Sequence, residues 1–369
     1  MLDHVIKSIS GFLIRLESRY GLVAASLVVT LILTGIAVIY VQPIFTVAFH
    51  GLLFQDLSSH PFSFHIENHL QYRILGPLLG YLLFLRGDLF FILPLIFIAL
   101  FPAITYYSYR KKKIEPIDSF FLACFIAMSC VVLLPLVAPG YTDVITWFFI
   151  FLAFSNAKKI LKSAIFFSLA LLNHESSLVL LPGLILYSWW LQKSGFMKII
   201  LVYMLACIPH LIYRQFVDAH VTPLYSVSFY LSETNFWFVM HKLVLYLPAA
   251  IFYAFKLWWI FPVCFVAWSI NQKKFLQCCI IACITGGAFI LVFIGYDYTR
   301  MVVIAFPAVL LSYEWFKEIL EMKKLRKLTV VIIVLNFLIL QYQFNYDGAQ
   351  PMFPWILNKI SAMAGIPLV

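Results

Sequence analysis

Residues 43–77 read PIFTVAFHGLLFQDLSSHPFSFHIENHLQYRILGP, and this polar stretch decides how the rest of the chain is arranged. It is the longest break between strongly apolar segments in the first half of the chain. It carries two acids, Asp56 and Glu67, the cation Arg73, and the histidines His50, His60, His65 and His69. Because a membrane-spanning segment precedes it, we expect residues 42–73 to form a loop on the non-cytoplasmic side.

The composition indicates a membrane protein. The 369 residues are 63% hydrophobic and 11% charged, whereas about a quarter of the residues in soluble domains are charged. We therefore predict one all-α polytopic membrane domain over residues 1–369, with about 10–13 transmembrane or re-entrant helices. Residues 1–20 are expected to form an interfacial cytoplasmic helix, and residues 21–41 the first span.

The basic residues set the expected topology. The net charge of +10 comes from short clusters between apolar spans, which is the pattern of cytoplasmic loops, so we expect no nucleic-acid partner. The basic cluster at residues 110–113 should be cytoplasmic, so an odd number of crossings must connect it to the first loop. We therefore expect residues 74–85 to be a short surface or re-entrant helix rather than a second crossing. Residues 163–191 lie between basic clusters at 158–162 and 193–198, so this segment must leave the cytoplasm and return to it. Each arm has about 12–14 residues and reaches about 18–21 Å into a core about 30 Å thick, so the turn at 173–177 should lie at membrane depth.

Several polar side chains map to the non-cytoplasmic ends of the predicted spans. Ionisable groups at membrane depth are costly, so they are candidates for a functional site. Each also has a structural interpretation. Asp143 can cap the helix that follows it, and Arg73 can extend towards lipid headgroups. His174 and Glu175 can form a buried pair, and Asp297 can form an ion pair with Arg300.

The residue types suggest roles in catalysis and binding. Asp56 or Glu67 can act as a general base, unless both are solvated loop acids. Asp143 can orient a substrate hydroxyl or bind a metal, and arginines such as Arg73 suit a phosphate. His65 and His69 have a zinc-like spacing, but the acid between them is out of phase with H-E-x-x-H. The seven cysteines form no CxxC pair. We therefore predict no cofactor, and a divalent metal is left open.

The order of these motifs resembles the GT-C superfamily of polytopic glycosyltransferases, including mannosyltransferase-like members. The resemblance rests on four short motifs: Tyr72-Arg73-Ile74-Leu75-Gly76-Pro77, Thr142-Asp143, His174-Glu175 with Pro182 after it, and Asp297-x-x-Arg300 with Pro307 after it.

The resemblance implies transfer of a sugar from a polyprenyl-phosphate donor to a glycan, lipid or protein acceptor, on the non-cytoplasmic face of a multi-pass protein surrounded by membrane lipids. The expected location is the bacterial inner (cell) membrane. The resemblance implies that Asp56 or Glu67 is the base, and that Arg73, with Arg300 as a second ligand, binds the donor phosphate. We further expect His174, Glu175 and Asp297 to contribute to substrate binding.

Three other functions fit the same sequence features. A transporter or lipid flippase would also need a charged cavity within the membrane. A membrane acyltransferase would use His174 as its base. A membrane metalloprotease would depend on the histidines of the first loop.

Overall fold

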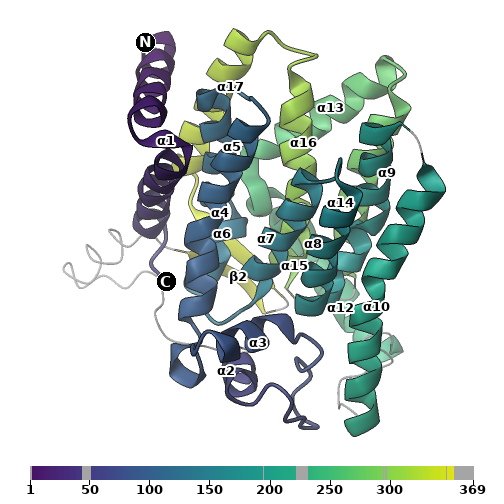
Figure 1. Ribbon diagram of the computed structural model, residues 1–369. Helices are drawn as coiled ribbons and strands as arrows, with labels where there is room; N and C mark the ends of the chain where they lie inside the picture. The colour runs from purple at the N-terminus through teal and green to yellow at the C-terminus, as the bar shows by residue number, and fades with distance from the viewer. Residues whose placement is uncertain are drawn as a thin grey trace.

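The computed structural model describes residues 2–43, 51–193, 195–221, 232–293, 295, 297–345 and 347–352. Most of them belong to a bundle of helices, shown in Figure 1. This confirms the expected all-α polytopic membrane protein. Within the described ranges, seven helical segments are long and apolar enough to cross a membrane: Leu2–Tyr40, Gly87–Lys111, Pro116–Val137, Phe196–His220, Met240–Asn271, Phe275–Val292 and Tyr298–Phe316.

The first helix, α1 (Leu2–Tyr40), changes direction at Gly21, where φ is 79° and ψ is 166°. Glycine adopts positive φ without the steric cost of a Cβ. The kink falls at the expected boundary between the interfacial helix and the first span. Glu17, in the part before the kink, lies 2.7 Å from the Arg110 Nε, which ties this part to α4 (Ile92–Lys111).

The first loop contains more regular structure than the sequence suggested. It carries α2 (Gly51–Ser59), and it is followed by α3 (Leu75–Leu82) and the short 3-10 helix η1 (Gly87–Leu89). With eight residues, α3 is about 12 Å long and cannot cross a membrane, as expected for residues 74–85. His50 belongs to residues 44–50, which lie outside the described part of the chain.

The middle of the chain forms a row of short helices. The predicted span at 119–138 is divided at Ser129, whose backbone is extended (φ −107°, ψ 170°). The predicted excursion at 163–191 is two helices joined by a 3-10 turn. The elements are α5 (Pro116–Met128), α6 (Cys130–Val137), α7 (Asp143–Ser155), α8 (Ile160–Asn173), η2 (Glu175–Leu180) and α9 (Leu181–Gln192).

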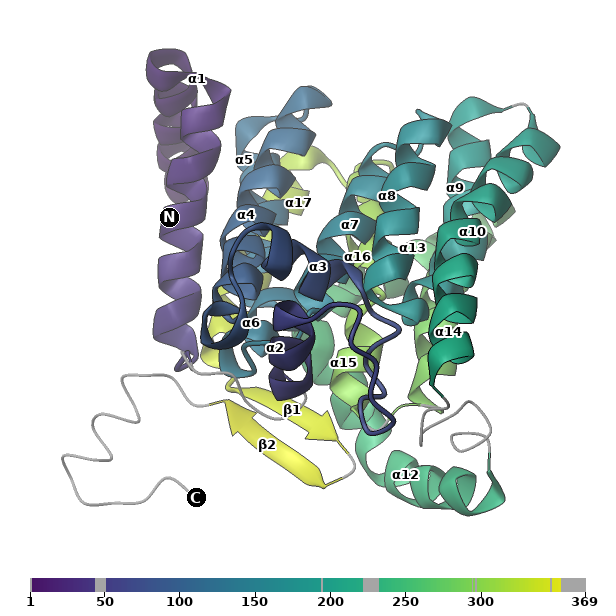
Figure 2. The ribbon, with the colours of Figure 1, turned by 60° about the horizontal axis from the view of Figure 1, so that its bottom comes forward.

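The second half adds longer helices and a hairpin. The helices are α10 (Phe196–His220), α12 (Glu233–Phe255), η3 (Lys256–Trp259), α13 (Ile260–Asn271), α14 (Phe275–Val292), α15 (Tyr298–Val303), α16 (Phe306–Phe316) and α17 (Met322–Leu338). The sequence analysis expected no strand, but β1 (Gln341–Asn345) and β2 (Gly348–Met352) pair antiparallel. In Figure 2 the hairpin lies at the same end of the bundle as α2 and α12.

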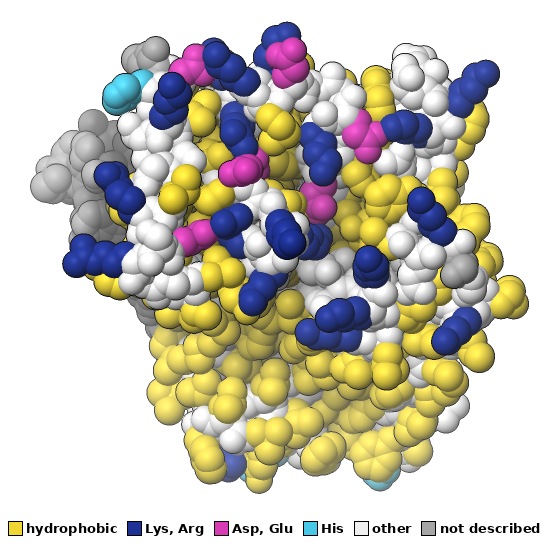
Figure 3. Space-filling view, turned by 45° about the horizontal axis from the view of Figure 1, so that its top comes forward, with side chains coloured by type: hydrophobic (Ala, Val, Ile, Leu, Met, Phe, Trp, Pro, Cys, Tyr) yellow, Lys and Arg dark blue, Asp and Glu magenta, His cyan; other side chains and the backbone are white. Residues whose placement is uncertain are grey.

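The two ends of the bundle differ in charge. Lys and Arg side chains gather on the face shown in Figure 3, which is the top of Figure 1. We call this the basic end, and we call the end with α2, α3 and the hairpin the opposite end. By the positive-inside rule the basic end is the expected cytoplasmic side.

A buried lysine stabilises the opposite end of the bundle. Lys256 is 2% exposed, and its Nζ donates to the Tyr40 hydroxyl (2.6 Å) and to the carbonyls of Asn336 (3.1 Å) and Ile339 (2.6 Å). It thereby joins η3 to the ends of α1 and α17.

Candidate functional site

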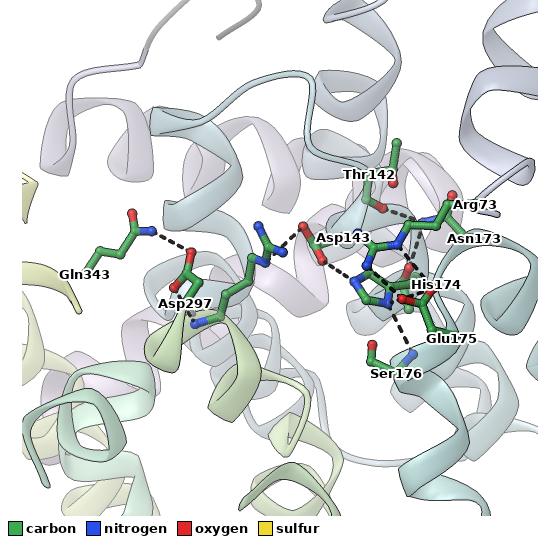
Figure 4. A network of polar contacts seen from close by, with 11 residues as sticks. Arg73, Thr142, Asp143, Asn173, His174, Glu175, Ser176, Asp297 and Gln343 are labelled. Atoms are coloured by element: carbon green, nitrogen blue, oxygen red, sulfur yellow. Dashed lines mark hydrogen bonds and ion pairs between the residues drawn. The ribbon is translucent and has the colours of Figure 1, made fainter. Parts of the chain in front are cut away.

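Six ionisable side chains lie together at the opposite end of the bundle, and we call them the polar network. They come from the loop before α3, the start of α7, the turn between α8 and η2, and the start of α15. Figure 4 shows them in a chain of contacts. The members are Arg73, Asp143, His174, Glu175, Asp297 and Arg300.

Arg73 and Glu175 form a two-point ion pair. The Arg73 Nη2 donates to Glu175 Oε1 at 2.8 Å, and its Nε donates to Oε2 at 3.2 Å. Paired charge-assisted bonds of this kind fix the orientation of the guanidinium as well as its position. Arg73 therefore points into the protein rather than out to lipid headgroups, although the two residues are 102 positions apart in the chain.

Asp143 faces His174 across a short gap. Asp143 is the first residue of α7 and is 7% exposed, and its Oδ1 lies 3.7 Å from His174 Nε2. His174 Nδ1 accepts a hydrogen bond from the Ser176 backbone N–H at 3.2 Å. Because Nδ1 is an acceptor, a neutral imidazole carries its proton on Nε2. That N–H faces the Asp143 carboxylate.

The Arg300 guanidinium lies on the other side of Asp143. Its Nε is 3.6 Å from Asp143 Oδ2, which is too long for a hydrogen bond. Within the described residues this buried Nε has no hydrogen-bond partner. The guanidinium carbon lies 4.9 Å from the centre of the Tyr141 ring, within range of a cation–π interaction. The Arg300 Nε can therefore donate a hydrogen bond to a ligand that lies next to the Asp143 carboxylate.

Asp297 has a different role from the ion pair that we considered. Its Oδ1 accepts the backbone N–H of Arg300 at 3.2 Å, which caps the start of α15. Its Oδ2 accepts from Gln343 Nε2 of strand β1 at 2.8 Å. Asp297 therefore connects α15 to the hairpin, while the Arg300 side chain turns towards Asp143.

Asn173 joins the two helices that carry the central pair. It is fully buried, and its Nδ2 donates to the Thr142 carbonyl and to the Thr146 hydroxyl, both at 2.7 Å. Gly76 of α3 packs on the same place, since an added Cβ would lie 2.6 Å from Thr142 Cγ2 and 3.0 Å from Asn173 Oδ1. These contacts fix the ends of α7, α8 and α3 against one another.

A small pocket opens beside the polar network, with an empty volume of about 200 Å³. Its polar lining comes from three members of the network and Ser176, and its apolar lining from α7, α14 and the region of α15. It is lined by Asp143, Trp147, His174, Ser176, Leu291, Arg300, Met301 and Ile304. Asp143 and Arg300, an acid and a cation, therefore border the same small space.

The structure leaves two candidate acids outside the polar network. Asp56 on α2 and Glu67 in a turn are both exposed, and neither forms an ion pair or a side-chain hydrogen bond within the described residues. His65 lies outside any regular element and His69 lies in a turn, so neither is on a helix. In the described part of the chain, no group of three or more His, Cys, Asp or Glu side chains is arranged to hold a metal ion.

Sequence reasoning missed Asn173, Trp147 and Gln343 as parts of this region. Asn173 had a usable signal, because it directly precedes His174 at the end of an apolar helix. Gln343 also had one, because the alternation at 341–344 followed by Asp347-Gly348 is typical of the hairpin that places it beside Asp297.

Comparison with protein families, with curated proteins and with solved structures finds no match to this chain.

Proposed function

We propose that this protein is a membrane glycosyltransferase that transfers a sugar from a polyprenyl-phosphate donor to an acceptor on the non-cytoplasmic face. One observation carries the proposal: a buried acid and an incompletely paired arginine, Asp143 and Arg300, border one pocket at the end of the bundle away from the lysines. The ordered motifs of the GT-C superfamily support it.

Asp143 is the best placed base. In the proposed step, the acceptor oxygen forms a bond to the anomeric carbon while its proton moves to the Asp143 carboxylate. His174 Nε2 lies beside this carboxylate, 3.7 Å from its Oδ1. A buried base positioned by a neighbour suits general base catalysis. Asp56 and Glu67 are exposed and lack such partners among the described residues, so we assign the base to Asp143 in preference to them.

Arg300 is the best placed phosphate ligand. The bond between the anomeric carbon and the phosphate oxygen breaks, and the electron pair stays on the lipid phosphate. A cation held at that oxygen stabilises the developing charge. Arg73 already makes two bonds to Glu175. We therefore propose that Arg73 holds the loop against the site, and that Arg300 receives the phosphate.

The test uses purified protein with a panel of polyprenyl-phosphate sugars, scored by thermal stabilisation and by sugar transfer. Asp143→Asn is expected to bind the donor but to lower transfer at least about a hundredfold, since one positioned base is worth about 10²–10⁴-fold. Arg300→Gln is expected to lose donor stabilisation. Asp56→Asn and Glu67→Gln should remain within a few-fold of wild type.

Asp118→Asn is the matched control. Asp118 is also a buried acid, 2% exposed, and it pairs with Arg326 at 2.7 Å at the basic end. This variant should lose stability and keep its specific activity. The proposal fails if no donor stabilises or reacts with the wild-type protein, or if Asp143→Asn and Asp118→Asn lose activity equally.

The second candidate is a proton-coupled transporter or lipid flippase. The observation that favours it is the alternation of acids and bases from Asp143 through His174 to Glu175, with spacings of 3.7 Å and 3.6 Å. Such chains of ionisable groups carry protons in pumps and transporters. Proton uptake by proteoliposomes that stops in Asp143→Asn, without sugar transfer by the wild type, would favour this candidate. Acyl transfer with His174 as base fits less well, because Ser176 occupies one ring nitrogen and Asp143 faces the other.

A further inference from the structure

The basic end is divided into two halves with different charge pairing. Over α1, α4, α5, α16 and α17, nearly all the acids pair with a base, although these elements also carry bases that form no ion pair with the described residues. In Figure 3, acidic side chains lie among the basic ones over only part of the face. The pairs are Glu17–Arg110, Glu314–Lys112, Asp118–Arg326, Glu318–Lys274, Glu321–Lys324, and Asp3 with Lys323 and Lys327.

The other half has lysines without acids. We call Lys158, Lys159, Lys162, Lys193 and Lys198 the five-lysine patch. All five are exposed, and none forms an ion pair with the described residues. The sequence contains no acid between Asp143 and Glu175, nor between Glu175 and Asp218. The helices that carry this patch therefore have their acids, Asp143 of α7 and Asp218 of α10, at the far end and offer no counterion at the basic end.

The patch is continuous across two chain turns. The turn between α7 and α8 contacts the end of α9 through a hydrogen bond from Gln192 Nε2 to the Lys158 carbonyl at 3.1 Å. The start of α10 packs beside α9 through the rings of Trp189 and Phe196, whose centroids are 5.0 Å apart. The lysines of both turns are thus held on one stretch of surface.

Helix stability explains three of these positions, because Lys158, Lys159 and Lys193 follow the C-terminal ends of α7 and α9, where the helix dipole favours cations. It does not explain the other two. Lys162 lies in the first turn of α8 and Lys198 in the first turn of α10, and neither turn contains an acid. The positive end of the helix dipole disfavours cations in a first turn and favours anions. Two helix starts and five lysines therefore direct positive potential at the same surface, which is how proteins bind phosphates.

Apolar side chains border the patch. Leu161 is 71% exposed, Met197 73% and Leu201 59%. On helices that meet a bilayer, such side chains contact acyl chains while neighbouring lysines reach the headgroups. An acidic protein partner would not require this apolar surface directly beneath the charges.

We propose that the five-lysine patch binds the headgroups of anionic phospholipids in the leaflet at the basic end. The lysines and the two helix starts bind the phosphates, and the exposed leucines and methionine contact the chains. This inference does not depend on the proposed enzymatic function, because its test measures lipid binding alone.

The test compares retention of phosphatidylglycerol and phosphatidylcholine by the purified full-length protein, by native mass spectrometry in mild detergent. The wild type is expected to prefer phosphatidylglycerol. The variant K158Q/K159Q/K162Q should lose at least about tenfold of that preference. The control K323Q/K324Q/K327Q removes three lysines that already have acidic partners and should keep the preference.

Three outcomes would overturn the proposal. The first is equal loss of preference in the patch and control variants, which means a response to net charge alone. The second is displacement of the lipid by equimolar soluble glycerol phosphate, which means a simple anion site. The third is displacement by an acidic peptide at the same concentration, which means a protein site. If the triple variant is unstable, K193Q/K198Q tests the patch from α9 and α10.

Discussion

At the scale of single residues, Asn173 holds the spacing between Asp143 and His174. We predict that Asn173→Ala destabilises the protein by about 1–3 kcal/mol, because the Thr142 carbonyl and the Thr146 hydroxyl lose a buried donor. The transfer rate should fall at least about tenfold, since misplacing a catalytic group by about 1 Å can cost about 100-fold. Chemical denaturation in mild detergent and the transfer assay measure the two effects.

Asn156→Ala is the matched control for this change. Among the described residues, Asn156 Nδ2 bonds only to the Leu152 carbonyl, at the C-terminal end of α7 and at the basic end. Both readouts should stay close to wild type. An Asn173→Ala protein that is as stable and active as Asn156→Ala would contradict the positioning role.

The sequence predicted the central residues of the site because charge is conspicuous among apolar spans. Asp143, His174 and Arg300 stand out wherever ionisable groups are rare, and the basic clusters assign them to one end of the spans. A neutral side chain such as Asn173 gives no such signal. Charge alone also cannot separate a buried acid from an exposed loop acid such as Asp56, because that depends on how the loop folds over the bundle.

At the scale of elements, α3 positions the Arg73 loop by packing closely through Gly76. We predict that Gly76→Ala costs about 1–3 kcal/mol and displaces α3, since the new Cβ would lie 2.6 Å from Thr142 Cγ2. Arg73, three residues earlier, should then lose its two-point contact with Glu175. A double-mutant cycle between Arg73→Lys and Glu175→Gln, measured with and without Gly76→Ala, should show a smaller coupling in the alanine background.

Gly286→Ala serves as the control for this cycle. A Cβ at Gly286 on α14 meets no atom within 4 Å, and alanine favours a helix interior by up to about 1 kcal/mol over glycine. The coupling should be unchanged in that background. Equal coupling in both alanine backgrounds would show that α3 does not position Arg73.

The first loop also contacts the end of α10. Tyr72 donates a hydrogen bond to the Asp218 carboxylate, and Tyr213 donates to the Gln71 carbonyl at 2.9 Å. Burial, together with the hydrogen bond to Asp218, raises the pKa of Tyr72 to about 12, so its hydroxyl remains a donor at neutral pH. These contacts hold the residues just before Arg73 against the end of α10.

We predict that Tyr72→Phe loosens this loop without unfolding the bundle, because it removes the donor and keeps the ring beneath Arg214. Hydrogen exchange of the amides at residues 60–73 should become several-fold faster, while exchange in α4 and α16 stays unchanged. Tyr20→Phe, at an exposed tyrosine on α1, should change neither region. Unchanged exchange at 60–73 would show that other contacts hold the loop.

The length of the apolar runs in the sequence predicted the long spans. It did not predict the break at Ser129 or the short helix α2. The division at Ser129 and the helix α2 follow from local packing rather than from apolar length. The hairpin had a usable signal, because the alternating stretch Gln341–Phe344 precedes the turn dipeptide Asp347-Gly348. The apolar-span interpretation passed over it, so the contact of Gln343 with Asp297 was missed.

At the scale of the whole molecule, charge pairing differs between the two ends. Lysines dominate one end, and the polar network with its pocket lies at the other. A lipid-linked substrate at the pocket would meet Arg300 and Asp143, while the five-lysine patch would hold anionic lipid on the far leaflet. Both proposals therefore require one fixed orientation in the bilayer.

That orientation gives the last prediction. A cysteine at Phe62, which is 61% exposed in the first loop, should react with a membrane-impermeant maleimide on intact cells. A cysteine at Gln272, exposed at the basic end, should react only after permeabilisation, because loops rich in Lys and Arg stay in the cytoplasm. The parental protein gives the background, since its seven cysteines lie in apolar runs. The reverse labelling pattern would place the polar network on the cytoplasmic side, and transfer at the non-cytoplasmic face would then be wrong.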